Sequence, residues 1–592
     1  MSIGKGLVAM VALLLATAAW ASRGFPEPFT VTQPDGSQIT VVLLGDEQHH
    51  WLQTTDGVMV VNTGRGYFVA EVDDQGRLRA SSVLAHEAKL RLESETAVIS
   101  RQQERRELFR QQSAHGQHRA AIATPSSPYL PHQGSPRILV ILAAFQDVPF
   151  TVGNPQQSFG QFLSGEEQAD LGHKEDKNTN SVMNYFKAVS QGQFTPQIDL
   201  AGPVTVSQNM AYYGADENVT ALAQEAVEQL DGQVDFSQYD NDGDGTVEAV
   251  YIIHAGYGEN IGAPSDALWA KTTTASVNTA DGVKIGRFCL SSELNGSGPE
   301  AFSDGIPWIN GIGVFVHELS HAMGLPDMYP VSESSKALNN QCMECWDLMD
   351  MGEYVSNGYT PAPYTAWEQE TMGWLEITEL KESQEGLTLK PVVEGGKAYK
   401  FGNGADPEEF IVVENIQRRG LHAKAYGHGL LVYHVAYKSS SVNMGDYPND
   451  VAGKPRMTVV PADGLLLSYN QVEGRGYGGT YTQKEYQQHH AGDPFPGTSN
   501  VTQLTDEMAL PNYCFYNGST QTGFSLQNIK EDTETGNVTF DFVREGTLGI
   551  SVNTQDSNAH QPIYSLDGRY VGTDIHRLPR GLYIRNGQKL HK

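Results

Sequence analysis

A short polar motif inside an apolar stretch constrains the fold of this chain more than any other feature. His317 and His321 are four residues apart, and Glu318 lies between them. On an α-helix this spacing places both imidazoles on one face, where they can bind one Zn²⁺. Glu318 then lies beside the first ligand, in the position of a general base that acts on a water without binding the metal. The sequence therefore predicts a helix that carries a zinc site.

The residues after the motif predict where this helix ends. Gly324 permits the left-handed backbone that terminates helices, and Pro326 disfavours α geometry at the residue before it. Because the chain must turn after the second histidine, Asp327 can swing back toward the metal as a third ligand. Two acids further along the chain, Glu344 and Glu370, are the alternatives for this role.

Such a centre is suited to the hydrolysis of amides. A catalytic zinc with three protein ligands lowers the pKa of its bound water to about 7 and polarises a carbonyl group. Glu318 can then take the proton of the water and pass it to the departing amine. The alternative is a surface adhesin or binding protein with a vestigial protease domain, but such a protein has no need to keep the base and the ligands together.

Several other segments accompany the motif, from residue 136 to about residue 545. They include Tyr185–Phe186, Trp346–Gly352, Ala366–Trp374, Gly429–Val435 and Asp493–Pro496. Together with the motif, these segments resemble the immune inhibitor A family of secreted bacterial zinc metallopeptidases. The resemblance implies a metzincin-like catalytic domain that cleaves proteins or peptides.

The resemblance also suggests roles for single residues. It implies that Met349 forms the methionine turn beneath the zinc, although a buried structural methionine would look the same in sequence. Tyr354 is a candidate stabiliser of the oxyanion. Two positions depart from the family: Asp327 stands where metzincins usually have a third histidine, and Ala436 replaces the usual aspartate after the strand Gly429–Val435.

A second candidate metal site lies upstream of the motif. Asp240, Asp242 and Asp244 occupy alternate positions of a glycine-rich loop, as at the opening of a calcium loop. An EF-hand would need a bidentate acid twelve residues in, and that position is Tyr251. We therefore expect either a Ca²⁺ site with other ligands or a plain solvated turn.

The first residues predict a secretory signal peptide. Lys5 precedes the short apolar run Gly6–Ala16, and small residues on both sides of Trp20 place cleavage after Ala21. No later stretch approaches the roughly 18 unbroken apolar residues that span a bilayer. We therefore expect an exported protein, secreted or on the cell surface, with no transmembrane segment in the mature chain.

Length and patterning predict a multidomain α+β protein. The 592 residues are too many for one core, and we expect the signal peptide to be followed by four units. Residues 22–136 predict a small β-unit, a charged helix and a polar linker, either a removable prosegment or a permanent accessory domain. Residues 137–380 form the expected catalytic domain, residues 381–545 a β-sandwich, and residues 546–592 a small all-β domain.

The end of the chain carries a second resemblance. Asp567–Arg569, Leu578–Ile584 and Asn586–Lys589 resemble the type A sorting domain of the Bacteroidota type IX secretion system. This resemblance implies the secretion machinery as a partner and export through the periplasm. An ordinary terminal β-hairpin is the alternative.

The net charge and the cysteine content give two further predictions. A formal net charge of −30 disfavours nucleic acid as a partner. The four cysteines of an exported chain predict a disulfide, with the pairing left open. Cys342 and Cys345 have the spacing of half a zinc knuckle, but the second half is missing, because Cys289 and Cys514 stand alone.

Overall fold

The computed structural model forms two compact units, Met1–Val543 and Arg544–Lys592. It describes residues 19–20, 22–46, 49–116, 129–165, 178–214, 218–298, 308–338, 340–402, 404–475, 477, 479–516, 521–545, 563–565, 570–572, 578–579, 581–585 and 588–591. Most of the expected signal peptide therefore lies outside the described residues. The two units are described separately below.

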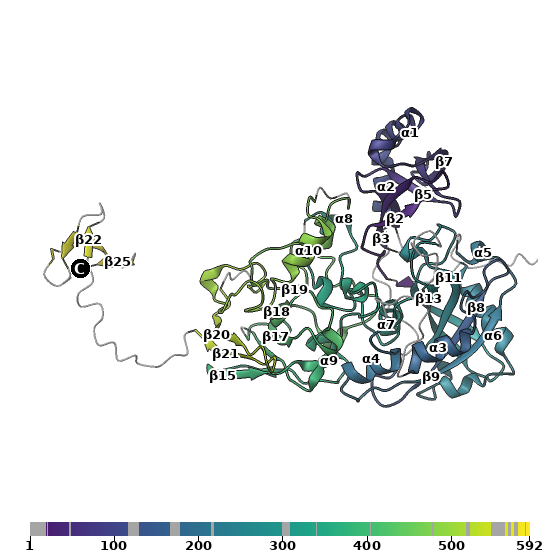
Figure 1. Ribbon diagram of the computed structural model, residues 1–592. Coiled ribbons are helices and arrows are strands. Elements are labelled where there is room, and N and C mark those ends of the chain that lie inside the picture. Colours follow the sequence, from purple (N-terminus) through teal and green to yellow (C-terminus); the bar gives the residue numbers. More distant parts are fainter. Residues whose placement is uncertain are drawn as a thin grey trace, which may run out of the picture. The chain divides into compact units, whose positions relative to one another are not determined.

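The first unit begins with a six-stranded antiparallel sheet whose strands follow one another in chain order. Its strands are β2 (Phe29–Thr32), β3 (Gln38–Asp46), β4 (His49–Thr54), β5 (Met59–Asn62), β6 (Tyr67–Val72) and β7 (Leu78–Leu84). Helices α1 (Glu93–Glu104) and α2 (Arg106–Gly116) follow, and α1 packs on this sheet through Val98 and Ile99 (Figure 1). The hairpins and the charged helical stretch expected from the sequence are thus present.

The central sheet is mostly parallel. Its strand order is β1-β12-β13-β11-β8-β9, and β10 also pairs with β13. The strands are β1 (Ala19–Trp20), β8 (Arg137–Ala144), β9 (Gln197–Thr205), β10 (Thr246–Val247), β11 (Val250–Tyr257), β12 (Lys271–Asn278) and β13 (Lys284–Leu294). Strand β12 runs antiparallel to β13, and β1 runs antiparallel along the outer edge of β12.

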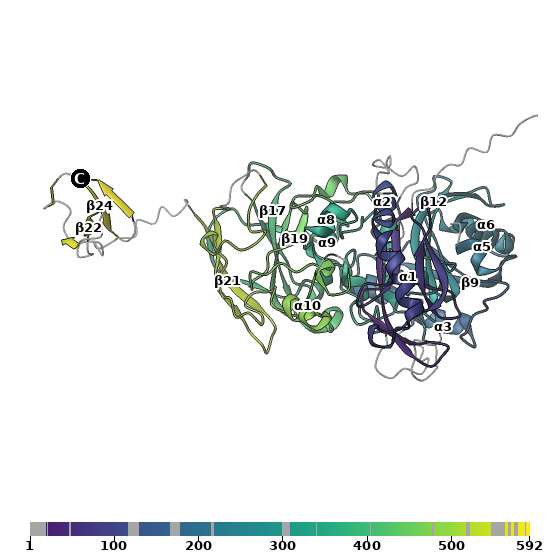
Figure 2. The same ribbon diagram turned by 90° about the horizontal axis from the view of Figure 1, so that it is seen from above.

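Two hydrophobic cores cover the two faces of this sheet. On β8 the residues Ile138, Val140 and Leu142 face one core, whereas Leu139 and Ile141 face the other, as the alternation of a strand requires. The first core contains α3 (Pro155–Ser164), α4 (Val182–Val189) and α7 (Ile312–Ala322); the second contains α5 (Met210–Gly214) and α6 (Val219–Leu230). Figure 2 shows α5 and α6 together on one side of β9. The apolar run at Arg137 is therefore a strand buried on both faces, as its composition predicts.

The rest of the first unit contains two further sheets. Five strands, β14 (Thr378–Glu379), β16 (Tyr399–Phe401), β17 (Phe410–Ile416), β18 (Gly429–Val435) and β19 (Met457–Val459), form one of them. The other consists of β15 (Gln384–Leu389), β21 (Val538–Arg544) and β20 (Phe524–Glu531). Residues from both sheets, among them Phe401, Val413, Phe524 and Phe540, share one hydrophobic core.

Short helices connect these sheets. They include α8 (Glu333–Ala337), α9 (Ala366–Thr371) and α10 (Gln483–His490). The 3₁₀ segments are η1 (Ala88–Leu90), η2 (Phe236–Tyr239), η3 (Glu259–Ile261), η5 (Glu344–Trp346), η6 (Met351–Tyr354), η7 (Val392–Glu394), η8 (Gly420–His422), η9 (Ser439–Ser441), η10 (Tyr469–Gln471) and η11 (Asp506–Met508). The sequence shows little helical patterning in this region because α10 has only two buried residues, Tyr486 and His490.

The second unit contains a four-stranded antiparallel sheet in the order β23-β22-β24-β25. Its strands are β22 (Ile563–Ser565), β23 (Tyr570–Gly572), β24 (Leu582–Arg585) and β25 (Gln588–His591). Two pieces of the proposed sorting motif, 567–569 and 586–587, lie outside the described residues. The described part of this unit is all-β, as expected.

The cysteines correct one prediction. All four are free thiols, so the expected disulfide is wrong for this structure. Cys289 and Cys345 are buried in the first core with apolar neighbours, where a thiol serves as a small hydrophobic side chain. None of the helices that the structure describes combines the length and hydropathy needed to cross a bilayer.

Candidate active site

The predicted motif lies on α7, a helix whose residues are all buried. The helix ends at Ala322, and Gly324 follows with a φ of 105°, the left-handed backbone that its sequence predicted. Leu325 then donates its backbone N–H to the carbonyl of Ser320 at 3.1 Å, which closes the turn. The chain reverses at this point, and this reversal brings Asp327 back to the helix.

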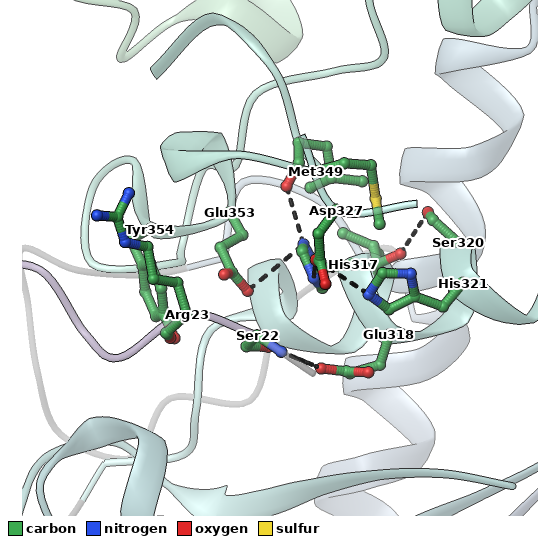
Figure 3. A network of polar contacts seen from close by, with 12 residues as sticks. Ser22, Arg23, His317, Glu318, Ser320, His321, Asp327, Met349, Glu353 and Tyr354 are labelled. Carbon is green, nitrogen blue, oxygen red and sulfur yellow. Dashed lines mark hydrogen bonds and ion pairs between the residues drawn. The ribbon is translucent and has the colours of Figure 1, made fainter. Parts of the chain in front are cut away.

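Three side chains meet beside α7. Oδ1 of Asp327 lies 3.3 Å from Nε2 of His317 and 3.3 Å from Nε2 of His321. All three residues are buried, and none of these three atoms has a hydrogen-bond partner of good geometry within the described structure. Figure 3 shows the two imidazoles and the carboxylate turned toward one another. Buried polar atoms without partners are rare, so this arrangement points to a ligand held between them.

The opposite nitrogens of the two rings are held by backbone oxygens. Nδ1 of His317 lies 3.0 Å from the carbonyl of Leu348, and Nδ1 of His321 lies 2.7 Å from that of Leu325. With a proton on each Nδ1, both Nε2 atoms present a lone pair to the shared point. Metal-binding histidines are usually oriented in this way.

The geometry suits a tetrahedral metal. Zinc bonds of about 2.0–2.1 Å separate neighbouring ligands by about 3.3–3.4 Å, and two imidazoles with one carboxylate leave the fourth position open. The donor set and its separations therefore fit a catalytic zinc ion, with His317, His321 and Asp327 as the residues that would hold it.

The surroundings of this point are acidic. Burial by itself would lower the pKa of His317, but Glu353 and Asp327 raise it to about 10. Oε2 of Glu353 lies 3.8 Å from Nδ1 of His317, and burial raises the pKa of Glu353 to about 8. Burial would also raise the pKa of Asp327, but the two histidines outweigh it and lower that pKa. These carboxylates favour a positive charge where the imidazoles meet, and a divalent cation supplies one.

The two alternative acids lie elsewhere. Oε2 of Glu344 accepts hydrogen bonds from the backbone of Tyr469 at 3.0 Å and from the hydroxyl of Tyr486 at 2.8 Å. Glu370 forms an ion pair with Lys400 at 2.6 Å. Among the described residues, Asp327 is thus the acid that the structure groups with the two histidines.

Glu318 has the surroundings expected of a general base. Its side chain is fully buried, and burial raises its pKa. Oε2 accepts a hydrogen bond of 2.8 Å from Oγ1 of Thr272 on β12, which fixes the orientation of the carboxylate. Oε1 accepts two hydrogen bonds of 2.8 Å, from the backbone nitrogen and from Oγ of Ser22.

The N-terminal segment thus lies in the candidate active site. Besides the two bonds to Glu318, the carbonyl of Ser22 accepts a hydrogen bond of 2.8 Å from Nε1 of Trp269. The backbone nitrogen of Phe25 donates to the carbonyl of Asn260 at 2.7 Å. Figure 3 shows Ser22 at the carboxylate of Glu318. Sequence reasoning missed this segment, although Ser22 directly follows the predicted cleavage site.

The two residues suggested by the family resemblance lie close to the centre. Met349 is fully buried after η5, and its carbonyl accepts the backbone N–H of Met328 at 2.8 Å, which ties its turn to the segment after Asp327. The hydroxyl of Tyr354 donates to the carbonyl of Arg23, so it contacts the backbone of the N-terminal segment. Sequence reasoning also missed Glu353 and Thr272, because neither stands in a pattern that marks a site.

The candidate calcium residues are also grouped. Carboxylate oxygens of Asp240, Asp242 and Asp244 lie within 4.8 Å of one another in the loop after η2. Backbone N–H groups of the same loop already donate to them, for example Gly243 to Asp240 at 2.8 Å. Clustered acids occur without a cation, so a calcium site stays a prediction.

Comparison with known proteins supports a metallopeptidase. Residues 133–375 match the model of a family described as immune inhibitor A peptidase M6, catalytic domain. The chain is 25% identical over 301 residues to the pre-pro-metalloprotease PrtV of Vibrio cholerae, a match that covers 43% of this chain and 32% of the relative. It is 24% identical over 263 residues to immune inhibitor A of Bacillus thuringiensis, with 38% of this chain and 37% of the relative covered. The chain therefore spans about a third of the length of these curated relatives.

Proposed function

We propose that this protein is a secreted zinc endopeptidase that is made as an inactive precursor. The observation that carries the proposal is the convergence of Nε2 of His317, Nε2 of His321 and Oδ1 of Asp327, three buried atoms without a hydrogen-bond partner in the described part of the chain. The matches to metallopeptidases support the same function independently. We further infer that residues 137–380 form a metzincin-like domain and that the two sheets after it form a β-sandwich.

The chemistry follows from the positions of the side chains. Bound zinc supplies a Lewis acid that polarises the substrate carbonyl and acidifies a water. Glu318 takes the proton of this water and returns it to the nitrogen of the departing amine. The contact of 2.8 Å between the backbone nitrogen of Ser22 and Glu318 marks where that amine nitrogen lies. Met349 forms the methionine turn beneath the metal site.

Tyr354, the candidate stabiliser of the oxyanion, contacts the backbone of the N-terminal segment. The hydroxyl of Tyr354 donates to the carbonyl of Arg23, one residue beyond the residue whose nitrogen contacts Glu318. In this arrangement Tyr354 holds the backbone of a bound peptide on its amine side. We propose this role for Tyr354 in addition to the stabilisation of the oxyanion.

The other parts of the chain fit a secreted precursor. We propose that residues 1–21 are a signal peptide, that residues 22–136 are an inhibitory prosegment, and that residues 546–592 address the protein to the type IX secretion machinery. Export would then run through the periplasm to the cell surface or the medium. Asp240, Asp242 and Asp244 are the proposed calcium ligands.

The alternative function is an adhesin with a vestigial protease domain. Loss of catalysis removes the pressure to keep a base and a metal site, yet here Glu318 is buried, oriented by Thr272 and placed beside the three candidate ligands. These contacts favour the peptidase.

The proposal is tested by metal content and turnover. We expect the chain, after cleavage between residues 111 and 136, to bind about one zinc and to hydrolyse casein, with activity lost to a chelator and restored by zinc. Glu318→Ala should keep the zinc but lower kcat by about 10²–10⁴-fold, whereas the exposed Glu376→Ala should change neither. Undiminished turnover in Glu318→Ala would rule out the proposed mechanism.

A further inference from the structure

The N-terminal segment crosses the candidate active site in the manner of a bound substrate. In the full chain, before the expected cleavage after Ala21, residues Ala19–Trp20 pair antiparallel with Thr272 and Thr273 on β12. An extended peptide that adds a strand to a sheet edge is a common mode of peptide recognition, because backbone hydrogen bonds hold any sequence. Two residues further along the chain, Ser22 contacts the carboxylate of Glu318.

This position defines the register of the segment relative to the chemistry. The base of a zinc peptidase returns a proton to the amine nitrogen of the cleaved bond, and here the nitrogen at Glu318 belongs to Ser22. The residue at position 22 therefore occupies the place of the first residue after the cleaved bond. Arg23 occupies the place of the second residue.

The backbone of both residues is held by groups of the expected catalytic domain. The carbonyl of Ser22 accepts from Trp269, and the carbonyl of Arg23 accepts from Tyr354. Neither bond depends on which side chains the segment carries. A substrate peptide can therefore take the same path, and its second residue would point its side chain where that of Arg23 lies.

The side chain of Arg23 lies in a formed pocket and is only 6% exposed. Nη2 donates to Oδ1 of Asn470 on η10 at 2.5 Å, and Nη1 lies 3.5 Å from the sulfur of Met351. The guanidinium also lies over the rings of Tyr469, at 5.1 Å, and Tyr329, at 5.6 Å. Two aromatic faces and an amide oxygen are groups that recognise a cation.

Two buried acids lie near the pocket and interact with the charge of Arg23. Burial raises the pKa of Glu344 and of Asp350, and the charge of Arg23 opposes both shifts. Glu344 is tied to the wall of the pocket, because its carboxylate accepts the backbone N–H of Tyr469. One like charge, Arg475, lies at 4.0 Å from the same ring of Tyr469 and donates to the carbonyl of Leu43 in β3.

We propose that this pocket is a specificity site that selects a basic residue, arginine above all, at the second position after the bond that the enzyme cleaves. Asn470, Tyr469 and Tyr329 are its specificity-determining residues, and Arg23 occupies the site in the precursor. The inference rests on the proposed peptidase function. Since Asn470 and Tyr469 lie after residue 380, the expected β-sandwich region contributes directly to substrate choice.

Cleavage of synthetic peptides tests this site. The substrates are quenched-fluorescent peptides that are identical except for the second residue after an Ala-Ser bond, which is Arg, Lys, Leu or Glu. The enzyme is the full chain cleaved between residues 111 and 136 and loaded with zinc. We expect kcat/KM to be about tenfold or more higher for Arg than for Leu, with Glu lowest, as one charge-assisted hydrogen bond and the aromatic contacts imply. Equal values for all four peptides would overturn the inference, whereas no cleavage of any peptide or of casein would overturn the peptidase function itself.

A matched pair of variants tests the pocket. Asn470→Leu removes the amide oxygen that accepts from the guanidinium and keeps a side chain of similar size. Gln471→Leu makes the same chemical change at the neighbouring position of η10, where the side chain is only half-buried. We expect Asn470→Leu to reduce the preference for Arg over Leu severalfold, and we expect Gln471→Leu to keep the preference. An unchanged preference for Arg in Asn470→Leu would contradict the assignment of this pocket. An equal loss of kcat/KM for all four peptides would contradict it as well.

Discussion

At the scale of single residues, the site depends on one carboxylate that lies outside the helix. The spacing of His317 and His321 supplies two candidate ligands from α7, and the third candidate, Asp327, requires the turn at Gly324. Oδ1 of Asp327 lies 3.3 Å from both imidazoles, and this buried atom has no hydrogen-bond partner among the described residues. The affinity for zinc should therefore depend on Asp327 almost as strongly as on the histidines.

We expect Asp327→Ala to weaken zinc binding by more than the roughly 10- to 100-fold that the loss of an outer-shell partner costs. Glu370→Ala is the control, because Glu370 pairs with Lys400 and not with the centre. Zinc affinity is measured by competition with a chromogenic chelator, and circular dichroism checks the fold of both variants. If Asp327→Ala binds zinc as tightly as the parent, another group is the third ligand.

At the scale of elements, the loop after η2 holds three carboxylates within 4.8 Å. Asp240 accepts backbone N–H groups of its own loop, so part of its charge is already compensated. The remaining repulsion should be relieved by a cation, which stabilises the folded state by mass action.

We expect millimolar Ca²⁺, added after removal of metal and re-addition of zinc, to raise the melting temperature. A stabilisation of about 1–2 kcal/mol raises the melting temperature of a cooperative unit of about 200 residues by several degrees. Asp242→Ala should abolish the shift, and Asp266→Ala, at an exposed position outside the loop, should retain it. A melting curve that calcium leaves unchanged would identify the loop as a plain solvated turn.

A second element-scale feature is a buried acid between β17, α9 and β18. Oε1 of Glu414 accepts from the backbone of Ala366 at 3.0 Å and from the hydroxyl of Tyr433 at 2.9 Å. Burial raises the pKa of Glu414 to about 7 from the usual value of 4.5. The folded state therefore retains a proton that the unfolded chain has already released, and this contribution to stability is lost as pH rises from 4.5 to about 7.

We expect Glu414→Gln to be more stable than the parent at pH 8, by up to about 3 kcal/mol, and about equal to it at pH 4.5. The amide keeps the acceptor for both hydrogen bonds and does not ionise. Urea unfolding at both pH values measures the difference, and the exposed Glu385→Gln is the control. If the difference in the free energy of unfolding between the parent and Glu414→Gln does not grow with pH, Glu414 does not have a raised pKa in the folded state.

At the scale of the whole molecule, the N-terminal region covers the base of the candidate active site. Ser22 donates twice to Glu318, and Tyr469 donates its hydroxyl to the carbonyl of Pro26. Residues 22–136 contain no cysteine, so a thiolate cannot be the blocking group. Cleavage after Ala21 would leave the α-amine of Ser22 at Glu318, where its positive charge strengthens the contact.

We expect the full chain to hydrolyse casein at least about tenfold more slowly than the same protein cleaved between residues 111 and 136, at matched zinc content. Added fragment 22–136 should inhibit the cleaved protein, and the same fragment without Ser22 and Arg23 should inhibit it less. A full chain as active as the cleaved form would show that this region is an accessory domain.

Sequence alone determined the features that depend on local pattern. The spacing of His317, Glu318 and His321, the helix end at Gly324 and the buried strand at Arg137 all follow from periodicity and backbone preference, and each element is present as α7, its turn and β8. The free cysteines show the limit of composition, because the number of cysteines does not determine whether two thiols meet in the fold.

Tertiary structure decided what depends on segments far apart in the chain. Ser22 and Glu318 are 296 residues apart, and Arg23 and Asn470 are 447 apart, so no local pattern links them. The choice of Asp327 over Glu344 and Glu370 likewise depended on where the chain returns after α7, and not on residue type. Local rules act over a few residues, whereas the candidate active site is assembled from segments far apart in the chain, and only the folded chain specifies those contacts.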